Sequence, residues 1–161
     1  MLRLIAAIYI ASIATSAVSS TFADEVLVNK SEKKLYLLKE KQILRAFNVA
    51  FGENPIGHKQ QEGDERTPEG AYTLDYKKED SAYFRAIHIS YPNANDLAQA
   101  KAKKVNPGGA IMIHGQRNGF GWAAPITQRF NWTNGCIALT NEDMQIVWNS
   151  IVPGTPIVIK P

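Results

Sequence analysis

The chain has 161 residues, of which 45% are hydrophobic and 20% are charged, and its formal net charge is +3. These fractions are close to the average for folded soluble proteins, so the composition excludes an extensively disordered chain and a bundle of membrane helices. The length suits one domain, and no segment repeats at a fixed period. The basic residues are dispersed and are not interleaved with aromatic ones, so we expect no nucleic-acid partner.

The first 23 residues have the pattern of a secretory signal peptide. Arg3 precedes an apolar run from Leu4 to Ala14, and small and hydroxylated residues follow as far as Ala23. The apolar run is too short to cross a hydrocarbon layer of ~30 Å comfortably, which favours cleavage after Ala23 over an uncleaved anchor. We therefore expect residues 24–161 to form one periplasmic or secreted domain without stable membrane insertion.

Short apolar runs predict several strands in the first half of this domain. Polar segments of hairpin length separate the runs at 26–28, 35–38, 43–44 and 47–51, which indicates an antiparallel meander. Residues 52–70 are rich in Gly, Pro, Glu and Gln without a regular period, so they predict a long loop of the kind that often carries function. Further strands are expected at 71–76 and 84–90, and Pro92 ends the second of them.

The second half combines helices with short apolar strands. Asn95 and Asp96 have the residue types of a helix cap, before a weakly amphipathic helix that runs to about Lys104. The apolar run 110–113 predicts a buried strand that ends at His114. The remaining expectations are one helical turn near Thr127, a strand over 136–139, a helix from Thr140 to Ile151, and a last strand over 155–160 that joins the sheet interior. Together these elements predict a mostly β fold with a few helices, of the α+β class.

Cys136 is the only cysteine, so an exported chain cannot use it for an internal disulfide. A free cysteine is often only a small buried hydrophobe, but it becomes a nucleophile where an imidazole takes its proton. Among the three histidines, His114 follows an apolar strand at the end where side chains commonly enter a site. We therefore pair His114 with Cys136. Gly135 permits a sharp turn, after which the N–H groups of Asn134, Gly135 and Cys136 would converge as an oxyanion hole.

Three elements of the chain carry a resemblance to a known family. They are Ile113-His114-Gly115, the segment Thr133-Asn134-Gly135-Cys136-Ile137, and the stretch from Gly63 to Tyr72. They are similar to the Ile-His-Gly, Ser/Thr-x-Gly-Cys-Ile and Gly-Asp-x-Arg-Thr-Pro-Glu-Gly-x-Tyr elements of the L,D-transpeptidase catalytic domain, also called the YkuD domain. The resemblance covers residues 26–159. It implies a mixed β-sandwich, a cysteine nucleophile, a histidine base, and a Gly115 carbonyl that orients the imidazole.

The resemblance also implies peptidoglycan stem peptides as the substrate, and no cofactor. Cys136 would attack the carbonyl at the L-centre of diaminopimelate and form a thioester. An amine acceptor would then give a cross-link or attach a wall-linked lipoprotein, whereas water would give carboxypeptidase or amidase activity. Many family members have Arg two residues after the cysteine, where this chain has Ala138. Residues 132–138 and 88–93 resemble a YafK-like branch, in which the activity includes release of lipoprotein from peptidoglycan, so transfer and hydrolysis both stay open.

Several further residues are candidates for substrate contact, and other functions are alternatives to this hypothesis. The candidate substrate contacts are His88, Trp122, Arg129 and Thr133, although His88 on an alternating strand also suits a structural role. His58 is expected to be a loop residue. A wall-binding module without turnover is an alternative that Ala138 motivates. A papain-like protease lacks the required order of residues, and a zinc site lacks the short ligand spacings that such sites usually show.

Overall fold

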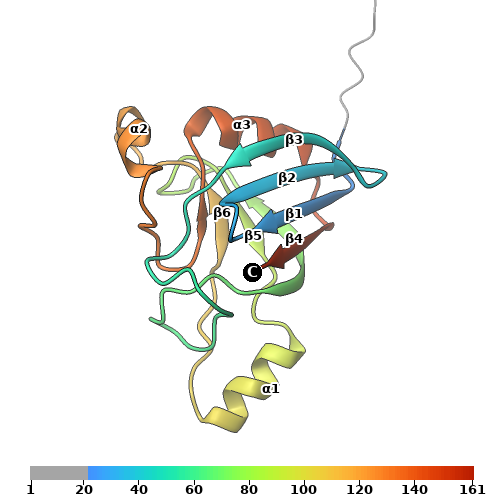
Figure 1. The fold of residues 1–161 in the computed structure, drawn as a ribbon, viewed down its shortest axis with the longest axis vertical. Coiled ribbons are helices and arrows are strands. Elements are labelled where there is room, and N and C mark those ends of the chain that lie inside the picture. Colours follow the sequence, from blue (N-terminus) through green and yellow to red (C-terminus); the bar gives the residue numbers. More distant parts are fainter. Residues whose placement is uncertain (1–21) are drawn as a thin grey trace, which may run out of the picture.

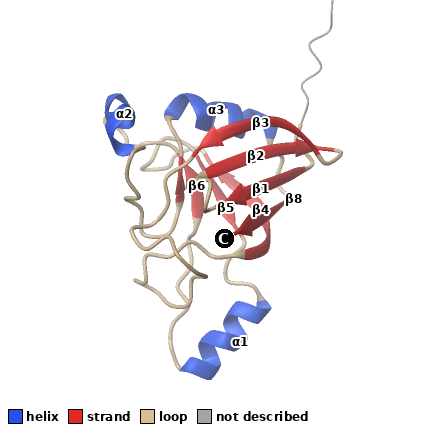
Figure 2. Cartoon of the chain, viewed as in Figure 1, coloured by secondary structure: helices blue, strands red, loops and turns tan. Residues whose placement is uncertain are grey.

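The computed structural model describes residues 22–161. Eight strands form one mixed sheet in the order β3-β2-β1-β8-β4-β5-β6-β7, and this sheet curls round the core (Figures 1 and 2). The strands are β1 (Glu25–Asn29), β2 (Lys34–Lys39), β3 (Gln42–Asn48), β4 (Gly70–Lys78), β5 (Ala86–Ile89), β6 (Met112–His114), β7 (Ile137–Ala138) and β8 (Thr155–Lys160). The helices are α1 (Ala94–Lys103), α2 (Ala124–Thr127) and α3 (Asn141–Ser150), with a 3-10 turn over Gly121–Ala123. The predicted mostly β fold with a few helices is confirmed.

The first three strands form the predicted antiparallel meander. The last strand, β8, lies inside the sheet, parallel to β1 and antiparallel to β4, as predicted. Alternation explains this position, since Ile157 and Ile159 are buried while their neighbours are less so. The core then gathers apolar side chains from both halves of the chain, including Met144, Val147 and Ile151 of the predicted C-terminal helix.

Two strands begin later than their apolar runs suggested. The run at 84–90 gives a strand only over Ala86–Ile89, and the run at 110–113 gives one over Met112–His114. Phe84 and Ala110 have positive φ angles of 56° and 53°, a left-handed conformation that cannot continue a strand. Hydropathy predicts which residues are buried but not their backbone angles, so the apolar pattern did not predict the later start of these two strands.

Helix α1 starts at Ala94, before the predicted cap residues Asn95 and Asp96, because Asn93 is its cap. The Asn93 side chain accepts hydrogen bonds from the N–H groups of Asn95 and Asp96, and the Asp96 carboxylate accepts from the Asn93 N–H. Asp96 is only 5% exposed and also accepts a hydrogen bond from the Tyr72 hydroxyl at 3.0 Å. The expected cap residues thus lie in the first turn, where an acid is favourable.

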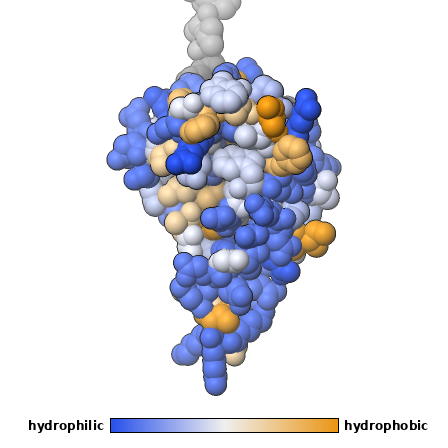
Figure 3. Space-filling model, turned by 90° about the vertical axis from the view of Figure 1, so that its left-hand side faces the viewer, coloured by the Kyte–Doolittle hydropathy of each residue, from blue (hydrophilic) through white to orange (hydrophobic). Residues whose placement is uncertain are grey.

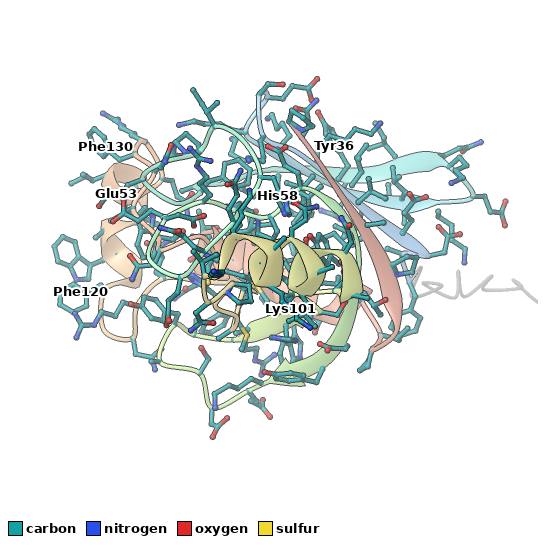
Figure 4. The ribbon with its side chains drawn as sticks, turned by 90° about the horizontal axis from the view of Figure 1, so that it is seen from below. Tyr36, Glu53, His58, Lys101, Phe120 and Phe130 are labelled. Carbon is teal, nitrogen blue, oxygen red and sulfur yellow. The ribbon has the colours of Figure 1, made fainter. Side chains whose placement is uncertain are left out.

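His58 links the long loop after β3 to this helix. Its Nε2 lies 3.1 Å from Asp96 Oδ1, and its Nδ1 accepts a hydrogen bond from the Glu69 N–H at 2.9 Å. Figure 4 shows His58 close to α1, which projects toward the viewer. An Nδ1 that accepts leaves Nε2 as the donor toward Asp96. The predicted loop residue therefore ties the loop to the helix.

The predicted signal peptide lies almost entirely outside the described residues. Of its 23 residues only Phe22 and Ala23 are described, and the Ala23 N–H donates to the Ser150 carbonyl at 2.9 Å. Within residues 22–161, no helix has both the length and the apolar content needed to cross a membrane.

The Asp96 network predicts a stability effect. We expect Asp96→Ala to lower the free energy of unfolding by about 2–4 kcal/mol, because it removes the Asp96 half of the capping box and leaves the buried Tyr72 hydroxyl without its Asp96 partner. Urea denaturation of residues 24–161 measures this change. Asp80→Ala is the matched control, since its side chain is exposed and should change stability by less than about 0.5 kcal/mol. Equal effects of the two variants would contradict the assignment.

Candidate functional site

The parallel pairing of β6 with β7 brings the two halves of the sequence motif together. Ile113 pairs with Ile137 and His114 with Ala138, so Cys136, the residue before β7, lies beside Met112. Side chains alternate along strands, which places Met112, His114 and Cys136 on one face and sends Ile113 and Ile137 into the core. His114 pairs with Ala138, two residues after Cys136, so the pairing places the imidazole and the thiol on the same face and close to one another.

This face forms the floor of an open cleft of about 350 Å³. Both His114 and Cys136 line it. The other lining residues come from the end of β4, the segment that leads into β5, the start of β6 with the residues before it, and the segment before Cys136, namely Lys78, Ser81, Ala82, Tyr83, Ala86, Ala110, Met112, Trp132, Thr133 and Asn134. A concave site with a thiol, an imidazole and two large aromatic rings has the general form of a ligand pocket.

The thiol of Cys136 is held between two backbone groups. The Met112 N–H donates to Sγ at 3.4 Å, and the Sγ–H donates to the Ala110 carbonyl at 3.7 Å. Burial raises the pKa of the Cys136 thiol, while the Met112 N–H and the positive charge of Lys59 act in the opposite direction. At neutral pH the resting sulfur is therefore a thiol, and it needs a base to become a nucleophile.

The imidazole of His114 is oriented by its neighbour along the chain. Its Nδ1 lies 2.7 Å from the Gly115 carbonyl, which can only accept, so Nδ1 carries the proton and Nε2 has the free lone pair. The side chain is 5% exposed, and burial lowers the pKa of His114 although the bond to Gly115 opposes this shift. The rings of Tyr83 and Trp132 flank it, with centroids at 4.8 and 5.7 Å. His114 is thus neutral at neutral pH.

The backbone after His114 is fixed by α3. The Gln116 N–H donates to Asn141 Oδ1 at 2.8 Å, and its buried amide donates to the Leu139 carbonyl at 2.7 Å. A Cβ at Gly115 would lie 2.6 Å from the same Asn141 oxygen, so position 115 requires glycine. The carbonyl that orients His114 is therefore held by contacts with the helix start.

Gly135 is required for two reasons. Its φ is 114°, and a Cβ there would lie 2.5 Å from the Arg66 carbonyl. The Gly135 N–H donates to Thr133 Oγ1 at 3.2 Å, and the same hydroxyl donates to the Cys136 carbonyl at 2.8 Å. Three N–H groups are expected to converge on an oxyanion, and one of them, that of Gly135, already donates to Thr133. The Thr133 hydroxyl thus stabilises the turn that contains Gly135.

The long loop after β3 packs against the turn that contains Gly135. Lys30 is buried and donates to the Gly57 carbonyl and to Glu69 at 2.7 and 2.6 Å, which ties the loop to the sheet. Burial alone would raise the pKa of Asp64, but N–H donors of the loop and Lys59 hold it below its usual value. The loop carbonyls of Glu65 and Arg66 thereby approach Gly52 and Gly135.

His88 is not among the residues that line the cleft. It lies on the same face of β5 as Ala86, but its Nδ1 is 2.7 Å from Asp75 Oδ1 and its ring stacks on Tyr76 at 4.6 Å. The structure therefore places this predicted contact next to the cleft, with its ring already engaged.

Trp122 and Arg129 line a second cleft, of about 590 Å³, which shares no lining residue with the first. Its walls come from α2, the end of β3 and the start of α3. Trp122 is 75% exposed, and both polar atoms of the Gln128 amide are buried without a hydrogen-bond partner among the described residues. Figure 3 shows the face that carries α2, where apolar side chains gather among polar ones. The structure thus separates these two predicted contacts from Cys136.

Lys78 is a cleft residue that the sequence did not reveal. It ends β4, and it reaches the cleft because of a bulge between Leu74 and Lys77. Without that bulge the pattern would put Lys77 in its place. Within residues 22–161 no group of three or more His, Cys, Asp or Glu side chains is arranged to hold a metal ion.

Comparisons with known proteins identify the family of this chain. The family model described as the L,D-transpeptidase catalytic domain, YkuD, matches residues 23–159. YafK of Escherichia coli (strain K12), which is provisionally named an L,D-transpeptidase, is 32% identical over 123 residues, which are 73% of this chain and 42% of YafK. The chain therefore spans less than half the length of this curated relative.

Solved structures show the same fold. The helical cell shape determining protein Pgp2 from Campylobacter jejuni superposes with a TM-score of 0.61 and 27% identity, over 85% of this chain and 48% of Pgp2. L,D-transpeptidase 3 from Mycobacterium tuberculosis, in complex with a faropenem-derived adduct, gives a TM-score of 0.55 at 17% identity, over 85% of this chain and 60% of that one. The motif, the curled mixed sheet and the family match lead to one conclusion: this chain belongs to the L,D-transpeptidase catalytic domain family.

Proposed function

We propose that this chain is an exported peptidoglycan enzyme that acts on diaminopimelate-containing stem peptides through a thioester on Cys136. The observation that carries the proposal is the placement of Cys136 and His114 on one face of the β6–β7 pair, in one cleft. Family membership supports the substrate class. The name of Pgp2 connects one relative to cell shape, and a wall-modifying activity would be consistent with such a role.

The chemistry follows from the protonation states. Nε2 of His114 takes the Sγ proton as sulfur attacks the carbonyl at the L-centre of diaminopimelate, so a C–S bond forms and the C–N bond breaks. The proton then passes to the leaving amine. An acceptor amine or water resolves the thioester and returns the thiol. The Met112 N–H stabilises sulfur whenever it carries negative charge.

The negative oxygen formed during attack needs N–H donors. Of the three predicted donors, Gly135 is bonded to Thr133, which leaves the N–H groups of Asn134 and Cys136 for this role. Loss of one such donor typically costs ~2.7–4 kcal/mol of transition-state stabilisation. Thr133 then serves by positioning, since its hydroxyl fixes the turn that presents both groups.

Muropeptide analysis tests the proposal. Purified mature protein is incubated with peptidoglycan tetrapeptides, and mass spectrometry identifies the products. We expect wild type to release the residue that follows diaminopimelate, with either a cross-link or a free acid as the second product, and we expect Cys136→Ala to form neither. A cross-link identifies a transpeptidase and a free acid identifies a hydrolase. Product formation by Cys136→Ala would rule out the mechanism, and a wild type that forms no product from tetrapeptides or from lipoprotein-linked stem peptides would favour a wall-binding module.

The pKa directions predict a pH profile. Burial lowers the pKa of His114 below its ordinary value of 6.5, so the imidazole stays a base down to more acidic pH. We therefore expect the rate of Cys136 acylation by faropenem to remain above half its plateau at pH 6.5 and to fall only below it. Intact-mass spectrometry between pH 5 and 10 measures this rate.

A variant without the base provides the control. In His114→Gln we expect acylation to be slower by ~10²–10⁴-fold at pH 7. Its residual rate should rise with pH beyond 9, because burial raises the thiol pKa above the ordinary value of 9.0. An acid limb centred above pH 6.5 in wild type, or an unchanged rate in His114→Gln, would overturn the assigned roles.

The second cleft provides a role for Trp122 and Arg129 that does not involve Cys136. An exposed indole offers a flat apolar surface for a sugar ring, and the unpaired Gln128 amide would bond an acetamido group. Arg129 and Lys33 line the same cleft together with Glu142 and Asp143, so its charged groups balance, as a neutral glycan requires. This combination fits the N-acetylated glycan backbone from which stem peptides branch.

Binding of peptide-free glycan strands tests this role. We expect Trp122→Ala and Gln128→Leu each to weaken binding about 10-fold while leaving faropenem acylation of Cys136 unchanged. Phe130→Ala is the matched control, because Phe130 is also an exposed aromatic side chain near α2 but does not line the cleft (Figure 4). Unchanged binding in both cleft variants, or an equal loss with Phe130→Ala, would contradict the assignment.

A further inference from the structure

We propose that Lys78 is a specificity-determining residue that binds a carboxylate of the donor stem peptide in the Cys136 cleft. This inference rests on the proposed function and names one chemical group that the substrate must carry. It comes from three observations, which are the register of β4, the composition of the cleft, and the weak pairing of the Lys78 ammonium.

The bulge in β4 decides which lysine enters the cleft. Leu74 pairs with Ile89, but Lys77 pairs with Ile87 and Lys78 with Ala86, so β4 has one extra residue between Leu74 and Lys77. A shift of one residue moves every following side chain to the other face of a sheet. Lys78 consequently shares the face of Ala86, which lines the cleft.

The neighbouring lysine confirms this change of face. Lys77 points to the opposite side, where its Nζ donates to the Trp148 carbonyl at 2.6 Å and lies 4.9 Å from the centroid of the Trp148 ring. Two adjacent lysines thus have separate roles, one against helix α3 and the other in the cleft.

The register also puts Lys78 in line with His114. Lys78 pairs with Ala86, Ala86 pairs with His114, and neighbouring strands are ~4.8 Å apart, so the two backbones are roughly 10 Å apart. Ala86 between them has only a methyl group. The four-carbon stem of Lys78 can therefore extend over Ala86 toward a ligand held at His114 and Cys136.

Lys78 is the one Lys, Arg, Asp or Glu among the described residues that line this cleft. Ala138, on the other side of His114 in the same row, is fully buried and uncharged. A single cation in a pocket rich in aromatic and small residues favours an anionic group on the ligand. The cleft therefore offers a carboxylate one charged partner, and that partner is Lys78.

The Lys78 ammonium is not committed elsewhere. Its nearest acid is Asp80 at 3.6 Å, and the two side chains are 46% and 89% exposed, so this ion pair is worth little and is readily exchanged. A substrate carboxylate would replace Asp80 in a less exposed setting, where a charge-assisted hydrogen bond is stronger.

Substrate variants that lack the carboxylate of diaminopimelate or that of the residue after it test the inference. Three stem tetrapeptides are compared, one unmodified, one with the side-chain carboxylate of diaminopimelate amidated, and one with the C-terminal carboxylate amidated. We expect wild type to process one of the amidated peptides with kcat/KM about 10- to 100-fold below that of the unmodified peptide, and this identifies the carboxylate that is bound. Lys78→Met should process the unmodified peptide with the same loss and should no longer distinguish the three peptides. Lys78→Arg should keep most of both the rate and the discrimination.

Two controls separate this inference from the proposed function. Lys101→Gln removes a positive charge from α1 (Figure 4), a helix that contributes no residue to the cleft, and should change nothing. Alkylation of Cys136 by neutral iodoacetamide should be equal in wild type and Lys78→Met, which shows an intact site. Wild type that fails on every peptide would refute the enzymatic function. Active wild type with equal rates on all three peptides, or Lys78→Met with full discrimination, would refute the role of Lys78 alone.

Discussion

The candidate site depends on the parallel pairing of two very short strands. Only Ile113 with Ile137 and His114 with Ala138 form the β6–β7 ladder, yet this pairing sets the imidazole and the thiol on one face. The Leu139 N–H extends the ladder by donating to the His114 carbonyl. On the other edge of β7, Ala50 and Ala138 exchange two backbone hydrogen bonds. Buried Ile113 and Ile137 fix the register, since a slip of one residue would send both into solvent.

Two close backbone approaches hold this pairing in place. Gly135 lies against the Arg66 carbonyl, and Gly115 lies against Asn141. Each glycine therefore marks a position where a segment distant in the sequence touches the motif. The long loop after β3, anchored by buried Lys30, acts here as a support for the cysteine turn. This explains why the loop and the cysteine segment occur as elements of one motif.

Burial keeps the two key side chains of the candidate site uncharged at neutral pH. Burial disfavours the charged forms of both Cys136 and His114, so the pair holds one proton on sulfur and one on Nδ1. The Gly115 carbonyl fixes the tautomer without introducing a buried negative charge. A neutral pair of this kind suits the proposed activation of the thiol by the imidazole as a general base. The acid limb of the proposed acylation rate would then report the pKa of the imidazole.

The sequence by itself determined the strand meander, the C-terminal helix, and the pairing of Cys136 with His114 as a hypothesis. These rest on local signals: apolar periodicity, turn residues and a motif of contiguous residues. Only the tertiary structure decided that Thr133 engages the Gly135 N–H, that Trp122 and Arg129 face a second cleft, and that Lys78 faces the first. Each of these depends on non-local register. A single bulged residue in β4 exchanges Lys77 for Lys78, and hydropathy does not distinguish two adjacent lysines.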